Sequence, residues 1–460
     1  MLSVTECIQQ LQILFGDTAQ KIAIETDFIQ RERKITALGW LLATVLGWMN
    51  NKNGTLETIS ANFEQQGVKI TEQGISKRFT PQAVDFLKQL IAHACMLLVC
   101  TNGEILPLTR RFNGVFVEDC STVRLPSDLI EAYAGCGGSG SEEKGAAIKT
   151  FCRVELTAGN FSEMIFDSGK TPDIKLANRA KPLPRGSLSL KDMGFFDLER
   201  LRRETAAGIF WITRIPAGTL IEVDGVQQSI GKFLSTCKED RIDIQAFLGK
   251  ERLPMRLVAL RVPEEVIKQR RARMEKQAKK KAKKKAKKGG KGGTKKAKKK
   301  GDPVSQERLY LSTWTVCATN LSASEYAADE VYTLYRIRWQ IELVFKLWKS
   351  EGGVASSHGK TGNRCLCEFL AKVLGQIIAN WLMLLRGGRL GEVSPTKMYR
   401  QVIDVIPDIA EALCRGDGEA LLETVNKLLS RLERINPKQV RKKQPSARQT
   451  LYENVTYALS

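Results

Sequence analysis

Four side chains near residue 340 have the types and the spacing that phosphate chemistry requires: Tyr335, Arg338, Glu342 and Lys349. On a helix, at about 100° per residue, they fall within an arc of roughly 60°. A carboxylate between two cations and a phenol could hold a metal ion beside phosphate-binding groups. The same face could also be a solvated surface with ordinary ion pairs. An apolar stripe lies on the opposite side of the predicted helix: Ile337, Ile341, Val344 and Trp348.

Two aspartates close short β-like runs and could meet Glu342. Asp119 ends GVFVED (114–119), and Asp192 ends LSLKD (188–192). Three carboxylates suit magnesium or manganese, and two such ions about 3.5–4 Å apart could promote phosphodiester displacement. Strand alternation puts the neighbouring Glu118 on the face opposite Asp119, but it leaves open which face is which. Three other acids compete by position alone: Glu118, Asp167 and Asp197.

The elements that must position these acids alternate between strand and helix. A helix is expected over Phe196–Thr205, and the final acidic helix over about 324–349. Strand, acid and helix in alternation predict an α/β sheet with polar groups at its carboxyl edge. Further β-like runs interrupt this pattern over 216–322, and a helical tail follows over 365–460. The predicted strands of the first part are 114–119, 149–159, 161–169, 188–192 and 209–215.

The first 105 residues are helical in pattern. Two short helices are expected over 55–65 and 71–79, separated by a turn at Gln66-Gly67, with Thr71 as a cap for the second. This pair is similar to a helix-turn-helix, although small helical bundles offer similar pairs. The second helix should expose residues suited to phosphates and base edges: Gln73, Ser76, Lys77 and Arg78.

Composition argues against disulfide scaffolding, zinc and a membrane span. The eleven cysteines show no CxxC pair, and the chain has only two histidines. Disulfides and a zinc site are therefore not expected, and a reducing cytosol fits this use of cysteine. The N-terminal residues lack the pattern of a signal peptide. The apolar runs 38–49 and 373–385 are too short to cross a bilayer and predict buried helices.

The formal net charge of +22 comes mostly from one segment. Residues 268–300 carry 19 Lys/Arg against one acid, so subtracting this +18 leaves +4 for the rest of the chain. We expect this Lys-rich arm (268–301) to be disordered, or at most an exposed, fraying helix. It should attract polyanions, first nucleic acid and second an anionic membrane surface, unless it is merely a solubilising insert.

Four segments together resemble the DDE transposases of bacterial insertion sequences, in the branch with the Tyr-Arg-Glu-Lys signature (insertion sequence family four). The signature is complete as Tyr335-x2-Arg338-x3-Glu342-x6-Lys349. VEDCST and KDMGFFDLERL fit the two aspartate motifs, so the resemblance selects Asp119 and Asp192 over their neighbours. ITRI, with Arg214, resembles the arginine strand that follows. The resemblance covers roughly residues 50–385, and the Lys-rich arm departs from the family pattern.

The resemblance implies a ribonuclease H-like catalytic domain with a β-rich insertion, flanked by helical regions. In some members the insertion presents a tryptophan that receives a flipped base, and Trp314 stands at the matching place; the alternative is a core tryptophan. The implied division is a helical DNA-binding domain (1–105), the first part of the catalytic core (106–215), the insertion (216–322), the acidic helix and the helix after it (323–385), and a helical region with possible dimerisation (386–460).

The activity implied is metal-dependent cleavage at transposon ends, giving a 3′ hydroxyl that attacks opposite or target DNA. Cut-and-paste transfer through hairpinned ends is expected, with a homodimer bringing together two inverted repeats in the bacterial cytoplasm, at the nucleoid. Two Mg²⁺ or Mn²⁺ ions would bind Asp119, Asp192 and Glu342. The alternative is a non-catalytic DNA-binding protein derived from a transposase. The residues that would grip DNA phosphates are Tyr335, Arg338, Lys349 and Arg214.

Overall fold

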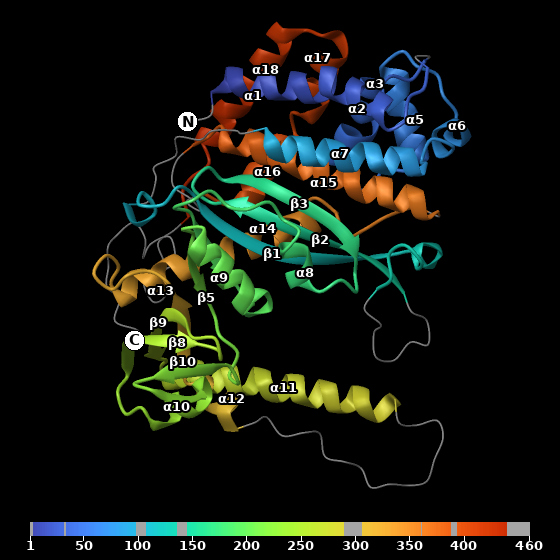
Figure 1. The fold of residues 1–460 in the computed structure, drawn as a ribbon. Helices are drawn as coiled ribbons and strands as arrows, with labels where there is room; N and C mark the ends of the chain where they lie inside the picture. Colours follow the sequence, from blue (N-terminus) through green and yellow to red (C-terminus); the bar gives the residue numbers. More distant parts are fainter. Residues whose placement is uncertain are drawn as a thin grey trace.

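The computed structural model describes residues 3–31, 34–97, 107–135, 145–288, 306–359, 361–387 and 393–438. Ten strands form one mixed sheet in the order β3-β2-β1-β4-β5-β10-β9-β8-β6-β7. Helices cover both faces of the sheet (Figure 1). The strands are β1 (Val115–Leu125), β2 (Ala146–Glu155), β3 (Asn160–Ser168), β4 (Leu188–Lys191), β5 (Phe210–Thr213), β6 (Leu220–Val223), β7 (Val226–Ser229), β8 (Arg241–Leu248), β9 (Leu253–Arg261) and β10 (Trp314–Thr319).

The first half of the sheet carries the predicted acids. Strands β1, β2 and β3 pair antiparallel, and β4 and β5 then join β1 in parallel. The parallel connections run through α8 (Asp173–Ala177) and α9 (Leu198–Ala206), the latter close to its predicted position. All five strands predicted before residue 216 are therefore confirmed, with β1 longer than expected because pairing with β2 continues to Leu125.

The insertion extends this sheet. Strand β10 pairs antiparallel with β5 on one side and with β9 on the other, so the catalytic-core strands and the insertion strands are continuous. The last of the β-like runs expected within 216–322 is half wrong, because its first part lies in helix α12 (Gln306–Leu311) and only its second part forms β10. A second hydrophobic cluster, which includes Trp211, Leu257 and Trp314, fills the insertion together with α10 (Ile230–Thr236).

The predicted acidic helix is two helices. The segment begins at Ala328, later than expected, and divides into α13 (Ala328–Ile337) and α14 (Trp339–Ser350) at Arg338. The break is a tightened turn, because the Arg338 amide donates to the Tyr335 carbonyl and the Ile341 amide donates to the Arg338 carbonyl. The tightened turn therefore lies in the middle of the Tyr-Arg-Glu-Lys signature, although Arg338 itself keeps helical backbone angles.

The N-terminal and C-terminal helices share one hydrophobic core. That core runs from Cys7 to Leu432 and includes inner residues of the sheet. Helix α7 packs on α15, and α1 packs on α18 (Figure 1). The helices are α1 (Val4–Ile13), α2 (Ala19–Glu25), α3 (Ala37–Leu41), α4 (Gly47–Asn50), α5 (Leu56–Gln65), α6 (Glu72–Ser76), α7 (Pro81–Met96), α15 (Gly362–Leu384), α16 (Pro395–Ile403), α17 (Ile406–Arg415) and α18 (Gly418–Glu433).

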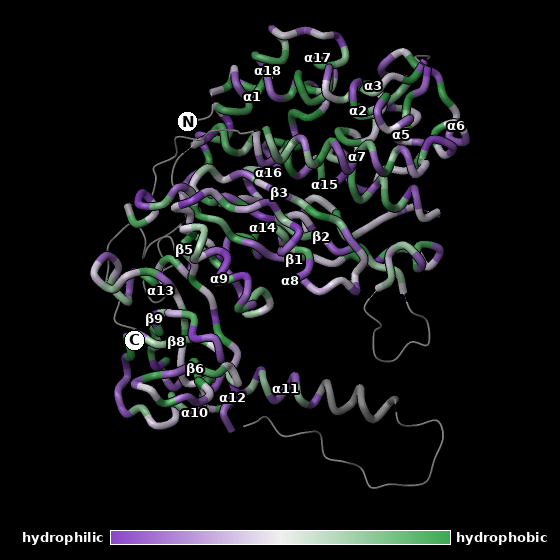
Figure 2. Tube along the Cα trace, viewed as in Figure 1, coloured by the Kyte–Doolittle hydropathy of each residue, from purple (hydrophilic) through white to green (hydrophobic). Residues whose placement is uncertain are grey.

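The predicted buried helices are confirmed. α15 is largely apolar (Figure 2), and its 23 residues are long and apolar enough to cross a membrane, but 94% of its most apolar window is buried inside the fold. Such burial is typical of the central helix of a folded core. The nine cysteines among the described residues are free thiols.

The predicted helix pair near the N-terminus is present in shortened form. The Thr71 hydroxyl accepts from the Gly74 amide at 3.2 Å and so caps α6, as predicted. α6 ends at Ser76 rather than Phe79, and both Ile75 and Phe79 are buried in the core. Of the four side chains that were predicted to be exposed, Gln73, Ser76 and Lys77 are exposed and Arg78 is half-buried.

The first part of the Lys-rich arm is helical. Residues Glu264–Lys288 form one helix, α11, and its root is packed rather than disordered. Ile267 is 7% exposed, and Arg270 donates to the Trp314 carbonyl at 2.6 Å. Of the two predicted forms, residues 268–288 therefore take the exposed helix, and the anchored side chain of Arg270 is the feature that the prediction did not include. Residues 289–301 of the arm lie outside the described residues.

Candidate active site

The strand register brings the two predicted aspartates to one place. Strands β1 and β4 run parallel with Val117 opposite Leu190, and two further residues along both strands put Asp119 beside Asp192. Val117 and Leu190 face the main core, so strand alternation turns both aspartates toward the same face of the sheet. Asp192 is at the N-terminal cap position of a short 3-10 turn, but its carboxylate makes no capping hydrogen bond.

Glu342 reaches this face from α14, which packs against β1. The pKa of Asp119 reflects the acids around it. Burial raises the pKa of Asp119 from 3.8 to about 6, against a hydrogen bond from the Cys120 amide and the charge of Arg338, and the charges of Asp192 and Glu342 raise it further. Asp119 therefore lies close enough to Asp192 and to Glu342 for the charge of each to act on it, although residues 119, 192 and 342 are far apart in the chain.

Glu342 is held by an ion pair. The Arg338 guanidinium donates to Glu342 Oε1 at 2.7 Å, and the two side chains are 13% and 32% exposed. Arg338 also lies 5.9 Å from the ring centroid of Tyr335. Burial raises the pKa of Tyr335, Arg338 opposes that shift, and Asp192 adds to it, which places the phenol near the aspartates. Among the described residues, the Tyr335 hydroxyl and Arg338 Nε are buried without a hydrogen-bond partner.

The remaining members of the predicted set are separated from this cluster to different degrees. Arg214 follows β5, is half-buried, and contributes to the electrostatic environment of Tyr335. Lys349 is exposed at the last turn of α14, roughly 10 Å along the helix axis from Glu342 at 1.5 Å per residue. The structure thus places Arg214 near Tyr335 and leaves Lys349 at the surface.

Trp314 is a core residue. It is 1% exposed in the hydrophobic cluster of the insertion, and the Arg261 guanidinium lies 4.5 Å from its ring centroid. A base cannot stack on an indole that is covered in this way. The expectation that Trp314 presents its ring to DNA is therefore corrected, and the alternative of a strand tryptophan in the core holds.

The three rival acids have other partners. Glu118 is 0% exposed and pairs with Arg200 at 2.8 Å, on the sheet face opposite Asp119. Asp197 caps α9 by accepting from the Arg200 amide at 2.7 Å. Asp167 pairs with Arg179. Each rival is thus engaged away from the cluster formed by the selected carboxylates.

A buried charged network behind the aspartates was missed from the sequence. Although burial opposes ionisation of Glu118, the charges of Arg200, Lys191 and Arg153 hold its pKa well below the usual range. Lys191 in turn pairs with Glu204 at 2.8 Å. Glu118 and Lys191 immediately precede the two aspartates, so the network holds β1 and β4 beside the aspartates from the opposite face. A run of two charged residues at each predicted strand end was the available signal.

The three carboxylates of Asp119, Asp192 and Glu342 are donors of the type that a divalent cation binds. Carboxylate oxygens are the ligands that magnesium and manganese prefer. Within the described part of the chain, no three His, Cys, Asp or Glu side chains form a ready metal site. In this arrangement Glu342 is paired with Arg338.

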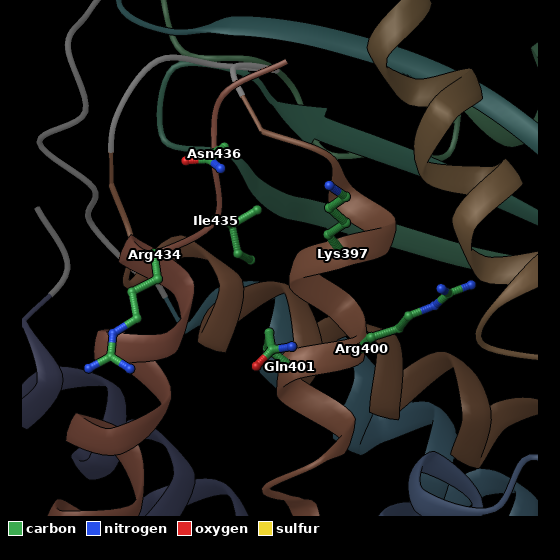
Figure 3. A pocket seen from close by; sticks show the side chains of 6 residues that line it. All are labelled: Lys397, Arg400, Gln401, Arg434, Ile435 and Asn436. Carbon is green, nitrogen blue, oxygen red and sulfur yellow. The ribbon is translucent and has the colours of Figure 1, made fainter. Parts of the chain in front are cut away.

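A basic hollow of about 310 Å³ lies elsewhere, on the C-terminal helices (Figure 3). It belongs to elements other than those that carry the three carboxylates, and we assign it no part in the active site. Its lining residues are Lys397, Arg400, Gln401, Arg434, Ile435 and Asn436.

The sequence matches known proteins that belong to a class of nucleic-acid-processing enzymes. Residues 111–376 match the family described as the Transposase DDE domain. The chain is 24% identical over 463 aligned residues to the transposase for insertion sequence element IS231D of Bacillus thuringiensis subsp. finitimus, covering 94% of this chain and 91% of that protein. It is 23% identical over 428 aligned residues to the transposase for IS1151 of Clostridium perfringens, covering 86% and 85%.

A shorter match reaches higher identity: 45% over 51 residues with the putative transposase InsL for IS186A of Escherichia coli (strain K12), covering 11% of this chain and 14% of that protein. The family match spans more than half of the chain. The protein therefore belongs to the DDE transposase family and is a transposase that acts on DNA. Divalent metal use is a property of that family.

Proposed function

We propose that the protein cleaves DNA at the ends of an insertion sequence and joins them to target DNA by a cut-and-paste DDE mechanism. The observation that carries this proposal is the convergence of Asp119, Asp192 and Glu342 on one face of the sheet. Their mutual repulsion is what a bound cation would relieve. The order β3-β2-β1-β4-β5, with three antiparallel strands followed by two parallel ones, supports a ribonuclease H-like core.

Asp119, Asp192 and Glu342 would hold two Mg²⁺ or Mn²⁺ ions. When bound, such ions would activate the attacking oxygen and stabilise the leaving oxygen. The raised pKa of Asp119 and the all-carboxylate donor set support this assignment. Asp119 keeps its backbone hydrogen bond from Cys120 at 2.8 Å, which orients the carboxylate on the strand.

The cations and the phenol beside the carboxylates would position DNA. Arg338 is partly exposed and has one unpaired Nε–H, so a phosphate could replace Glu342 as its partner. That exchange would release Glu342 toward the metal side of the site. Tyr335 and Arg214 would contact the same phosphate region, and the exposed Lys349 would hold a phosphate farther along the strand.

The DNA substrate would be a pair of inverted repeats brought together by a homodimer in the bacterial cytoplasm, with α5 and α6 contributing to end recognition. Two ends must be joined to one target, so two copies of the active site suit the reaction. The rival function is DNA binding without catalysis, by a protein derived from a transposase.

The test is cleavage of a plasmid that carries the element ends, with MgCl2, MnCl2 or EDTA, alongside DNA binding by fluorescence anisotropy. Glu342→Gln removes a ligand charge with little change in volume, and Glu423→Gln removes an exposed acid on α18 as the matched control. We expect Glu342→Gln to abolish cleavage while binding survives, and Glu423→Gln to cleave normally. Cleavage by Glu342→Gln at the wild-type rate would refute the site. Binding without cleavage by the wild type under every metal condition would favour the rival.

A further inference from the structure

Helix α11 is a long helix attached at one end. Its 25 residues span roughly 37 Å at 1.5 Å per residue. It follows Pro263, and Glu264 and Glu265 in its first turn favour the helix dipole. In Figure 1 its distal half extends from the insertion with no other described element overlapping it.

The root of α11 is fixed by packing and by three hydrogen bonds. Ile267 is buried against the insertion. Arg270 donates from Nη1 to the Trp314 carbonyl at 2.6 Å and to the Ser312 carbonyl at 3.2 Å, and from Nη2 to Thr315 Oγ1 at 2.8 Å. A guanidinium held by three acceptors on one neighbouring segment defines the direction in which the helix leaves the insertion.

Positive charge dominates the sequence of α11 beyond this root. Thirteen Lys/Arg and one acid lie between residues 268 and 288. Relative to Ile267, helical geometry places Arg270 and Met274 on the anchoring side. The exposed cations of the described side chains are Lys268, Arg271, Arg273, Lys276 and Lys279.

This charge pattern fits duplex DNA better than a membrane surface. A helix that lies in a membrane interface carries a broad face of large apolar residues. After Ile267, the described side chains of α11 include one large apolar residue, Met274. DNA offers phosphates along its backbone, and the length of α11 is similar to one turn of B-DNA, about 34–36 Å.

The root also contacts the catalytic side of the fold. Thr315, which accepts from Arg270, offers its carbonyl to the hydroxyl of Tyr332, and that hydroxyl also donates to the Val258 carbonyl at 2.9 Å. Tyr332 lies one turn before Tyr335 on α13. Burial lowers the pKa of Arg270 and the nearby charge of Arg214 lowers it further, so the root lies near the arginine proposed to contact phosphate.

We propose that α11 is a rigid cationic rod that binds the phosphate backbone of duplex DNA independently of sequence, and that Arg270 sets its direction relative to the active site. The identity of the partner as DNA rests on the proposed function. The rod would hold a stretch of duplex at a fixed angle to the carboxylates, whereas a disordered arm would only raise the local DNA concentration.

The first experiment measures binding of the full-length protein to a random-sequence duplex as salt is varied. Lys276→Gln with Lys279→Gln removes two exposed cations of the rod. The matched control, Lys232→Gln with Lys427→Gln, removes two exposed cations from α10 and α18. We expect the rod variant to reduce the slope of log affinity against log salt by roughly one to two, and the control to leave it unchanged. Equal effects of the two pairs would overturn the assignment.

The second experiment measures hydrogen–deuterium exchange over residues 264–279. Arg270→Gln and Arg271→Gln remove the same charge at adjacent positions, but Arg270 is anchored and Arg271 is exposed. Arg270→Gln should accelerate exchange several-fold and Arg271→Gln should not, while random duplex should protect the wild-type segment. Equal exchange in both variants, or protection by anionic vesicles and not by duplex at matched phosphate concentration, would refute the proposal. Neither readout requires cleavage, so a failure of the catalytic assignment would be seen separately.

Discussion

Replacing Asp119 by Asn should stabilise the protein at alkaline pH. Burial and the charges of Asp192 and Glu342 raise the pKa of Asp119 to about 6 in the fold, from an ordinary value of 3.8. The folded state therefore holds its proton more tightly than the unfolded state does. The contribution of Asp119 to stability is therefore most favourable below pH 4, where both states are protonated, and falls as the pH rises from 4 through 6. The variant keeps the shape of the side chain and the acceptor for the Cys120 amide but carries no charge.

The expected magnitude follows from the shift. A difference of about two pKa units corresponds to about 3 kcal/mol at 1.36 kcal/mol per unit, once the pH is well above 6. Asp119→Asn should therefore unfold with about 2–3 kcal/mol more free energy than the wild type at pH 8. The gain should shrink to roughly half at pH 5, where the wild-type carboxyl is mostly protonated in the fold.

Urea unfolding followed by tryptophan fluorescence, at pH 5 and pH 8, measures this difference. Glu423→Gln, on the exposed face of α18, serves as a control for loss of one negative charge. Addition of MgCl2 at pH 8 should stabilise the wild type and have a smaller effect on Asp119→Asn. An Asp119→Asn variant that is less stable than the wild type at pH 8 would refute the electrostatic reasoning.

Three further changes test other parts of the structure by the same unfolding assay. Glu118→Gln should cost about 3–5 kcal/mol, because it leaves the buried cations of Arg153 and Arg200 without their carboxylate; a change below 1 kcal/mol would contradict the network. Trp314→Ala should cost about 3–5 kcal/mol by opening a cavity, whereas a loss of end binding without a loss of stability would restore the base-stacking role. Thr71→Ala should cost about 1 kcal/mol by removing the cap of α6, and Thr71→Ser should recover most of it.

Much of the catalytic face could be predicted from the sequence because local patterns determine it. The apolar runs before Asp119 and Asp192 are short, and the parallel pairing of β1 and β4 places the two residues side by side. The face of each residue could not be predicted, because alternation assigns opposite faces without naming the inner one. The structure supplies that choice through Val117 and Leu190, which pack in the main core.

Features that depend on contacts between distant segments could not be predicted. The division of the acidic helix at Arg338 has no glycine or proline to mark it in the sequence. The tightened turn is made by residues that are compatible with a helix. The burial of Trp314 depends on the packing of the insertion around β9 and β10. The anchoring of Arg270 depends on carbonyl groups more than forty residues later, so composition alone indicated disorder.

The shared core of the first and last helices has a consequence for synthesis on the ribosome. α1 packs on α18 and α7 packs on α15, so part of the apolar surface of α1 and α7 has no partner until α15 and α18 have been translated. The N-terminal segment therefore cannot complete its folding in the order in which it is made. Stalled nascent chains that end before residue 362 should remain sensitive to protease over residues 3–97, and extension past residue 433 should make that segment resistant. Early resistance would show that these helices fold on their own.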